Sequence, residues 1–407
     1  MPKATKHGFK YWAGRLHLWL GLALGAVALL SYLPAALYAW EPELTDWYYH
    51  DLVFVPEVGT RPRSATELLA AAKAAVPAGH VVSALELTPG AARAYIFQTY
   101  KDNPQPGWTY FSQHQYWEQI YVDPYTGRVL GMVDVTRNWI ENLRVMHQQL
   151  LLRYDVGHFI IGTATLALLA AVLTGLVLWW PRNRAALRQR LTIKSDVRWR
   201  RRNYDLHNVG GFYAYAVILL LATSGLVWSF DWWEMGIYRL LGQTTKPGYG
   251  AHAAAPARPR TTATPLDAAL RHLQTQRPTW TNIYVALPEA ASKNPHELEG
   301  YVDYDGGTAW NESDTYFYHT ATGTVTYAEP FVQKTTGEKW RNSNYPIHIG
   351  TIFGWPTRVL VCLATLVCAS LPVTGFLIWW GRRHKARTAS ASSVVGRRRH
   401  PVAPQPV

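Results

Sequence analysis

The 407-residue chain carries 40 Lys and Arg against 27 Asp and Glu, a formal net charge of +13, and 48% of its residues are hydrophobic. A charge of this size can indicate a nucleic-acid partner. Here the basic residues gather in three segments, the N-terminus, 181–203 and the tail, which argues against such a partner. The mean hydropathy is near zero because two polar stretches, 41–150 and 234–346, dilute the apolar segments.

Four long apolar runs are predicted to be transmembrane helices. In chain order they are Leu18–Trp40, Phe159–Trp180, Val209–Trp233 and Val359–Trp380. Each is long enough to cross about 30 Å of hydrocarbon at about 1.5 Å per residue. Trp or Tyr stands at their ends, as is typical at a membrane–water interface. Together the runs favour a multi-pass membrane protein over buried core helices of a soluble protein.

The basic residues predict the topology. The loop 181–203 holds nine Lys and Arg residues, and both ends of the chain are basic as well. These three regions fall on one side of the membrane if the helices alternate, and the positive-inside bias puts that side in the cytoplasm. The N-terminus has no signal-peptidase pattern, so the first apolar run is expected to remain as an anchor. The two long polar stretches are then outside.

Each polar stretch has the pattern of a small α+β module. In the first, Ser64–Pro77 is predicted to be a helix with Ser64 and Glu67 as a capping box, followed by β-rich runs separated by Pro and Gly. In the second, 264–278 is the corresponding helix and 242–262 is a linker.

The two halves of the chain are predicted to be parallel copies of one unit, namely helix, external segment and helix. "TGLVLWWPRN" at 174–183 and "TGFLIWWGRR" at 374–383 are near-copies, and Leu-His opens both the first and the third helix. Such duplications place sites between repeats. The predicted segments are 1–40 (N-terminus and first helix), 41–150 (first external module), 151–181 (second helix), 182–203 (basic loop), 204–233 (third helix), 234–346 (second external module), 347–381 (fourth helix) and 382–407 (basic tail).

Four histidines form two related pairs in this arrangement. His17 and His207 lie at the inner ends of the first and third helices, and His147 and His348 precede the outer ends of the second and fourth. Ionisable groups at membrane depth are costly, and neutral imidazole is a good axial ligand of haem iron. No Cys-x-x-Cys-His motif is present, so the pairs predict two non-covalent b-type haems, one near each membrane face. The only cysteines, Cys362 and Cys368, are predicted to pack in the core.

His158 stays open as an alternative outer ligand. It lies eleven residues after His147, three turns further along an unbroken helix and near the same face. A chain break near 155–157 lets His147 approach the bilayer, and 354–356 offers His348 a matching break. The matched breaks favour His147 with His348. His158 is then a reserve ligand or a neighbour of a haem propionate.

The sequence resembles the PepSY-associated transmembrane family over about residues 10 to 385. The resemblance rests on the Asp-Pro-x-Thr-Gly hairpin at 123–127, on Leu-His before the first and third helices, and on "TGLVLWWPR". This family includes iron-regulated inner-membrane proteins and di-haem ferric-siderophore reductases. The resemblance implies an enzyme of the bacterial inner membrane that reduces ferric siderophores in the periplasm and releases Fe(II). No dinucleotide or flavin motif is present, so a quinol or a cytoplasmic reductase is the expected electron donor.

Two other functions stay open on the sequence alone. One is a membrane-anchored PepSY module that binds ligands or regulates proteases, without a cofactor or redox activity. The other is a haem subunit that passes electrons to another acceptor, such as a partner oxidoreductase or copper. The choice of siderophore, the donor and the oligomeric state carry no sequence signal.

Overall fold

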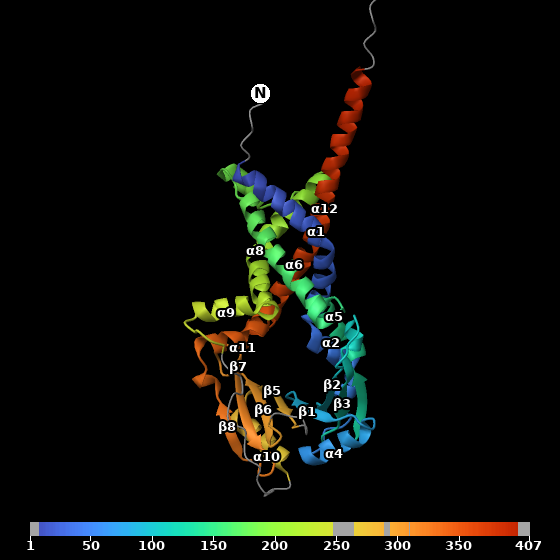
Figure 1. Ribbon diagram of the computed structural model, residues 1–407, viewed down its shortest axis with the longest axis vertical. Helices are drawn as coiled ribbons and strands as arrows, with labels where there is room; N and C mark the ends of the chain where they lie inside the picture. Colours follow the sequence, from blue (N-terminus) through green and yellow to red (C-terminus); the bar gives the residue numbers. More distant parts are fainter. Residues whose placement is uncertain (1–7, 247–263, 289–293, 309, 398–407) are drawn as a thin grey trace, which may run out of the picture. The chain divides into compact units, whose positions relative to one another are not determined.

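The computed structural model describes residues 8–246, 264–288, 294–308 and 310–397 (Figure 1). Residues 247–262 of the predicted linker lie outside this part of the chain. The chain divides into two compact units. The first, named the helical unit here, comprises 1–33, 163–222 and 363–407. The second, named the sheet unit, comprises 34–162 and 223–362.

Four helices are long and apolar enough to cross a membrane, which confirms the four predicted spans (Figure 1). They are α1 (Phe9–Tyr38), α6 (Tyr154–Trp179), α8 (Trp199–Ser229) and α12 (Trp355–Arg397, apolar enough over Trp355–Arg383). Each begins before the predicted apolar run, by ten residues in α8. Helical hydrogen bonding begins in polar sequence before each apolar run, so hydropathy alone places the starts of these helices too late.

The core of the helical unit is built from small and medium side chains. Ala214, Ile218, Ala364 and Cys368 are buried together. Glycine supports the same close packing, since a Cβ on Gly25 would lie 3.1 Å from Cβ of Pro372. Small residues let membrane helices approach closely, where dispersion contacts replace the hydrophobic effect. The predicted packing role of Cys368 is therefore confirmed.

The sheet unit contains one eight-stranded antiparallel sheet in the order β4-β3-β2-β1-β5-β6-β7-β8. Its first half follows α4 (Ala65–Ala75) and comprises β1 (Val82–Leu87), β2 (Tyr95–Asp102), β3 (His114–Val122) and β4 (Val129–Asp134). Its second half follows α10 (Pro265–Gln276) and comprises β5 (Trp280–Ala286), β6 (Glu297–Tyr304), β7 (Glu312–His319) and β8 (Val325–Glu329).

The two predicted α+β modules thus share one sheet, which the sequence did not predict. β1 and β5 pair antiparallel, with Leu85 opposite Val285 and Leu87 opposite Ile283. Either strand alone would expose an edge of unpaired backbone groups, and their pairing removes both edges. The sequence reports the strands of each module but not which edges meet.

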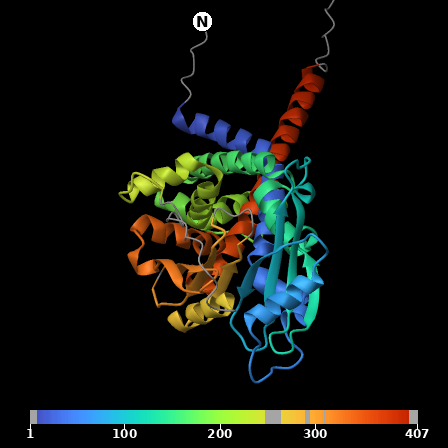
Figure 2. The ribbon, with the colours of Figure 1, turned by 60° about the horizontal axis from the view of Figure 1, so that its bottom comes forward.

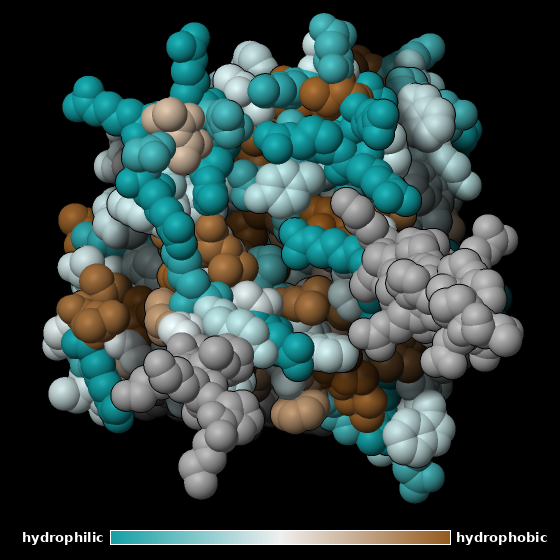
Figure 3. All heavy atoms as spheres, turned by 90° about the horizontal axis from the view of Figure 1, so that it is seen from above, coloured by the Kyte–Doolittle hydropathy of each residue, from teal (hydrophilic) through white to brown (hydrophobic). Residues whose placement is uncertain are grey.

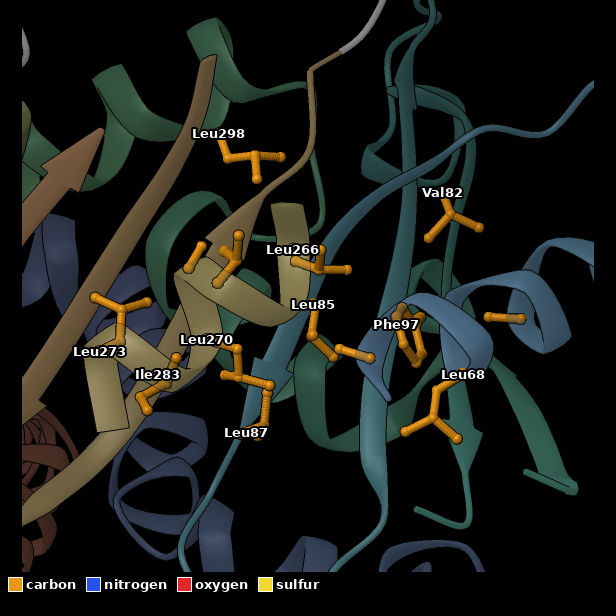
Figure 4. Close-up of a cluster of buried hydrophobic side chains, with 14 of the residues drawn as sticks. Leu68, Val82, Leu85, Leu87, Phe97, Leu266, Leu270, Leu273, Ile283 and Leu298 are labelled. Carbon is orange, nitrogen blue, oxygen red and sulfur yellow. The ribbon is translucent and has the colours of Figure 1, made fainter. Parts of the chain in front are cut away.

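One hydrophobic core joins the two halves of the sheet. Leu68 of α4 and Leu273 of α10 are fully buried in the same cluster as Leu85, Phe97 and Ile283 (Figure 4). Both helices therefore cover the same face of the sheet, and both come forward over the strands in Figure 2. Alternating strand residues supply this core because successive side chains point to opposite faces.

One of the two hydrogen bonds of the predicted capping box of α4 is present. Ser64 Oγ accepts a hydrogen bond from the Glu67 amide at 3.2 Å. An acidic side chain from the second half of the chain, Asp267, also supports this end of α4. Its Oδ2 accepts a hydrogen bond from Thr66 Oγ1 at 2.5 Å. An acid at a helix N-terminus satisfies free amides and complements the helix dipole.

The remaining α-helices of the described residues are short and lie between the long helices, or between these and the sheet strands, in the chain order. They are α2 (Glu41–Tyr48), α3 (His50–Val53), α5 (Trp139–Gln149), α7 (Arg184–Arg190), α9 (Asp231–Leu240) and α11 (Thr336–Ile349).

Both α5 and α11 end at a chain break just before a long helix. The predicted break at 354–356 is confirmed, because Gly350 and Gly354 both have positive φ before α12 begins. The predicted break at 155–157 was wrong, because the turn lies at Leu150 and Leu151, each with φ 56°. Leucine rarely adopts left-handed backbone angles. Because no glycine or proline stands at residues 150–153, the sequence carried no signal for a turn there.

Gly157 has a different role from the one predicted. It lies inside α6, where a Cβ would come within 1.9 Å of the Gln149 carbonyl oxygen. The glycine therefore permits α6 to begin directly against the end of α5.

Candidate cofactor-binding site

The structure brings His17 of α1 and His207 of α8 together in the helical unit. Their ring centroids lie 6.2 Å apart, and their ring planes are nearly perpendicular, at 84°. The sequence predicted this pair from Leu-His at the start of the first and third membrane helices.

Both imidazoles of this pair use Nδ1 for hydrogen bonds inside the protein. Nδ1 of His17 lies 2.9 Å from the Ala171 carbonyl oxygen, which only accepts, so this nitrogen carries the proton. Nδ1 of His207 lies 2.9 Å from Oγ1 of Thr374. That hydroxyl donates to the Ser370 carbonyl at 3.0 Å, so it accepts from the imidazole. Nε2 of each ring is then the nitrogen available to a metal.

The rings of His17 and His207 form part of the wall of a cavity of about 540 Å³. Its volume falls within the range of about 300–1,000 Å³ that is usual for cofactor sites. All four long helices line it, and they contribute six glycines, Gly14, Gly21, Gly25, Gly175, Gly211 and Gly375. Gly175 and Gly375 lie against the two imidazoles, and a Cβ on Gly21 would meet no atom within 4 Å. The lining therefore leaves space beside the imidazoles for a planar cofactor.

A second pair lies in the sheet unit. His147 of α5 and His348 of α11 have ring centroids 6.1 Å apart, with their planes tilted by 31°. Nδ1 of His348 lies 2.9 Å from Oγ of Ser224. Trp228 packs edge-on against His348 at 5.4 Å, and the Arg341 guanidinium lies over Trp228.

His158 has other partners. Its Nε2 donates to the Trp228 carbonyl oxygen at 3.0 Å, and its ring stacks on Tyr154 at 4.6 Å. Its Nδ1 is buried without a hydrogen-bond partner among the described residues. The structure therefore pairs His348 with His147. His158 is linked to this pair by Trp228, whose backbone carbonyl it binds and whose ring packs against His348.

The spacing of both pairs fits two axial ligands on one metal ion. Two metal–imidazole bonds of about 2.0 Å in a line, with the ring radii added, separate the centroids by about 6.3 Å. The observed distances are 6.2 and 6.1 Å. Two rings in simple edge contact also reach this distance. The glycine-lined cavity and the internal use of Nδ1 are the features that favour a metal-bound planar cofactor at the first pair.

Acidic side chains of the sheet unit do not form a metal centre of their own. Among the described residues, no group of three or more His, Cys, Asp or Glu is arranged to hold a metal ion. Glu86 accepts from Gln98 at 2.8 Å, and burial raises the pKa of this carboxyl.

The hydroxyl partners of the imidazoles are functional candidates that sequence reasoning missed. Thr374 and Ser224 hold Nδ1 of His207 and His348, and Oγ1 of Thr174 lies 3.4 Å from Nδ1 of His17. The near-copied "TG" at 174–175 and 374–375 was the available signal. It opened both repeated phrases but was interpreted only as part of a membrane helix.

Fold and site define a multi-pass membrane protein with a separate antiparallel sheet and two histidine pairs. A family model described as the PepSY-associated TM region matches residues 14–382. The chain therefore belongs to the PepSY-associated transmembrane family, as predicted. No curated protein matches the chain.

Proposed function

We propose that this protein is a di-haem oxidoreductase that carries electrons across the membrane and reduces ferric siderophores, releasing Fe(II). The observation that carries the proposal is the presence of two histidine pairs, each with the spacing of two axial ligands. His17 and His207 would hold one b-type haem, and His147 and His348 the other. The glycine-lined cavity supports the first assignment, and the family membership supports both.

Each bound haem supplies one-electron redox chemistry. The chain's own task is to hold imidazole nitrogens toward the iron in a fixed tautomer and to keep water away. Ferric iron in a siderophore takes up one electron and becomes Fe(II), which hard oxygen ligands hold less tightly. Dinucleotide-binding and flavin-binding motifs are absent from the sequence, so a quinol or a separate cytoplasmic reductase would supply the electrons.

The proposed location is the bacterial inner membrane, with both termini in the cytoplasm and the sheet in the periplasm. Exposed basic residues of α7 and the start of α8, among them Arg184, Arg188, Arg200 and Arg201, support this orientation. In Figure 3, hydrophilic side chains gather on the end of the molecule where these segments lie. The internal duplication is part of the proposal, with one module and two helices in each copy.

Single cysteines test this orientation in a background with Cys362 and Cys368 replaced by alanine. Gln105, after β2, and Gln189, in α7, are both exposed, so Gln105→Cys and Gln189→Cys are matched variants. A membrane-impermeant maleimide added to intact spheroplasts is expected to label Gln105→Cys and to leave Gln189→Cys unlabelled until the cells are lysed. The opposite pattern would invert the proposed direction of electron flow.

The proposed reaction is tested by mixing dithionite-reduced protein, freed of excess reductant, with ferric siderophores of several classes. Rapid reoxidation of haem is expected, with one Fe(II) trapped by a chelator for each haem oxidised. Iron-free siderophore is the matched control and should leave the haem reduced. Reduced protein that ignores the whole panel but passes electrons to copper or to a partner oxidoreductase would replace this function with the other redox function. A colourless protein would favour the cofactor-free module.

A further inference from the structure

The chain surrounds two of its four paired histidines with the same set of side chains. His207 closes the sequence Asn203-Tyr-Asp-Leu-His, and His348 closes Asn344-Tyr-Pro-Ile-His. The two histidines lie in different units and belong to different pairs. The motif Asn-Tyr-x-x-His therefore recurs at one histidine of each pair.

At His207 the partner segment is Thr374-Gly375 of α12. Asn203 is 3% exposed and its Nδ2 donates to the Thr374 carbonyl oxygen at 3.0 Å. Oγ1 of Thr374 accepts from Nδ1 of His207 at 2.9 Å. A Cβ on Gly375 would lie 3.3 Å from Cε1 of His207, so the ring rests against the glycine.

At His348 the partner segment is Ser224-Gly225 of α8. Asn344 is 1% exposed and its Nδ2 donates to the Ser224 carbonyl oxygen at 3.1 Å. Oγ of Ser224 lies 2.9 Å from Nδ1 of His348. A Cβ on Gly225 would lie 3.1 Å from Cε1 of His348. The contacts match those at His207 one for one.

His17 has part of the same arrangement. Thr174-Gly175 of α6 faces it, with Oγ1 of Thr174 3.4 Å from Nδ1 and a Cβ on Gly175 only 3.2 Å from Cε1. The residue four positions before His17 is Ala13, so the asparagine is missing. The main acceptor for its Nδ1 is a backbone carbonyl instead.

We propose that the asparagine, the hydroxyl residue and the glycine together form an imidazole clamp, and that its members are positioning residues for the haem ligands His207 and His348. This inference rests on the proposed function. The hydroxyl holds the proton on Nδ1, which leaves Nε2 bare for iron. The glycine lets Cε1 of the ring approach the backbone of the facing helix closely. The asparagine fixes the segment that carries both the hydroxyl residue and the glycine. Each pair contains one fully clamped histidine.

The clamp predicts a distinct electronic effect from loss of the hydroxyl. A hydrogen bond from Nδ1–H makes imidazole a stronger donor and favours ferric iron. Its removal should raise the midpoint potential of one haem only. Ring planes should change as well, and the electron paramagnetic resonance (EPR) spectrum of low-spin ferric haem depends on them. The nearly perpendicular pair with His207 is expected to give a larger principal g value than the pair with His348.

Thr374→Val and Ser224→Ala in the full-length, haem-loaded protein test the clamp. Because Thr374→Val changes neither iron ligand, the variant should keep both haems. At a fixed ambient potential near the midpoint, the reduced-to-oxidised ratio of the His207 haem should rise at least threefold in Thr374→Val. Its EPR signal should shift while the other signal stays in place. Ser224→Ala should raise this ratio and shift the EPR signal for the His348 haem only. Thr374→Ser retains the hydroxyl and should keep the wild-type values.

The outcomes separate the clamp from the proposed function. Selective loss of the His207 haem in Thr374→Val, with retention in Thr374→Ser, would also support a positioning role. Unchanged potentials and EPR signals in both hydroxyl variants, with two haems retained, would overturn the clamp and leave the di-haem function standing. A haem-free wild-type protein would overturn both.

Discussion

Replacing His207 by alanine is expected to remove one of two haems and leave the other spectrally unchanged. His207 faces His17 at 6.2 Å in the cavity of the helical unit, and the other pair lies in the sheet unit with its own partners. Loss of one axial ligand leaves an open position that alanine does not fill, so a non-covalent haem has little to retain it. His348→Ala should remove only the other haem.

His158→Ala is the matched control for these variants. It is a histidine of the same unit as His348, but its Nε2 is bound to the Trp228 carbonyl oxygen. Two haems per chain are expected to remain. Haem content measured by the pyridine haemochrome assay, with a folding check by size-exclusion chromatography, distinguishes the cases. Loss of the second haem in His158→Ala, with retention in His147→Ala, would reverse the proposed assignment of the outer ligand.

The second large effect is expected on electron delivery to the ferric siderophore. In His348→Ala the proposed exit haem is lost while the His17–His207 haem still accepts electrons. The remaining haem should therefore be reduced normally, but its reoxidation by a ferric siderophore should slow at least tenfold. The reason is distance, because the proposed topology would put the His17–His207 haem near the cytoplasmic face, across about 30 Å of hydrocarbon from the periplasm.

His207→Ala is the mirror-image control. It keeps the exit haem, so chemically reduced protein should still deliver one electron to the ferric siderophore at close to the wild-type rate. Re-reduction from the donor side should be slow. Stopped-flow absorbance at the Soret band, with an Fe(II) chelator present, records both phases. Equal reoxidation rates in the two variants would contradict a two-haem relay with a fixed direction.

Much of the fold was predictable from the sequence because apolar runs and Trp ends report membrane helices directly. The two histidine pairs were predictable for a related reason, since ionisable side chains are rare at membrane depth. The helices bring His17 to His207 and His147 to His348, as the sequence predicted from their matching positions.

The rest of the fold was less predictable because its determinants are tertiary. The turn after α5 uses two left-handed leucines, Leu150 and Leu151, which carry no turn signal. The union of the two sheet halves depends on β1 meeting β5, a contact about 200 residues apart in sequence. Thr374 and Ser224 looked like ordinary helix residues, because a hydroxyl that faces an imidazole differs from one that faces lipid only in three dimensions.

The decisive measurement is the haem content of purified wild-type protein from haem-replete cells. A Soret band and two b-type haems per chain are expected, extractable with acidic acetone because no covalent attachment motif is present. A folded, monodisperse protein without haem would contradict the proposed di-haem function.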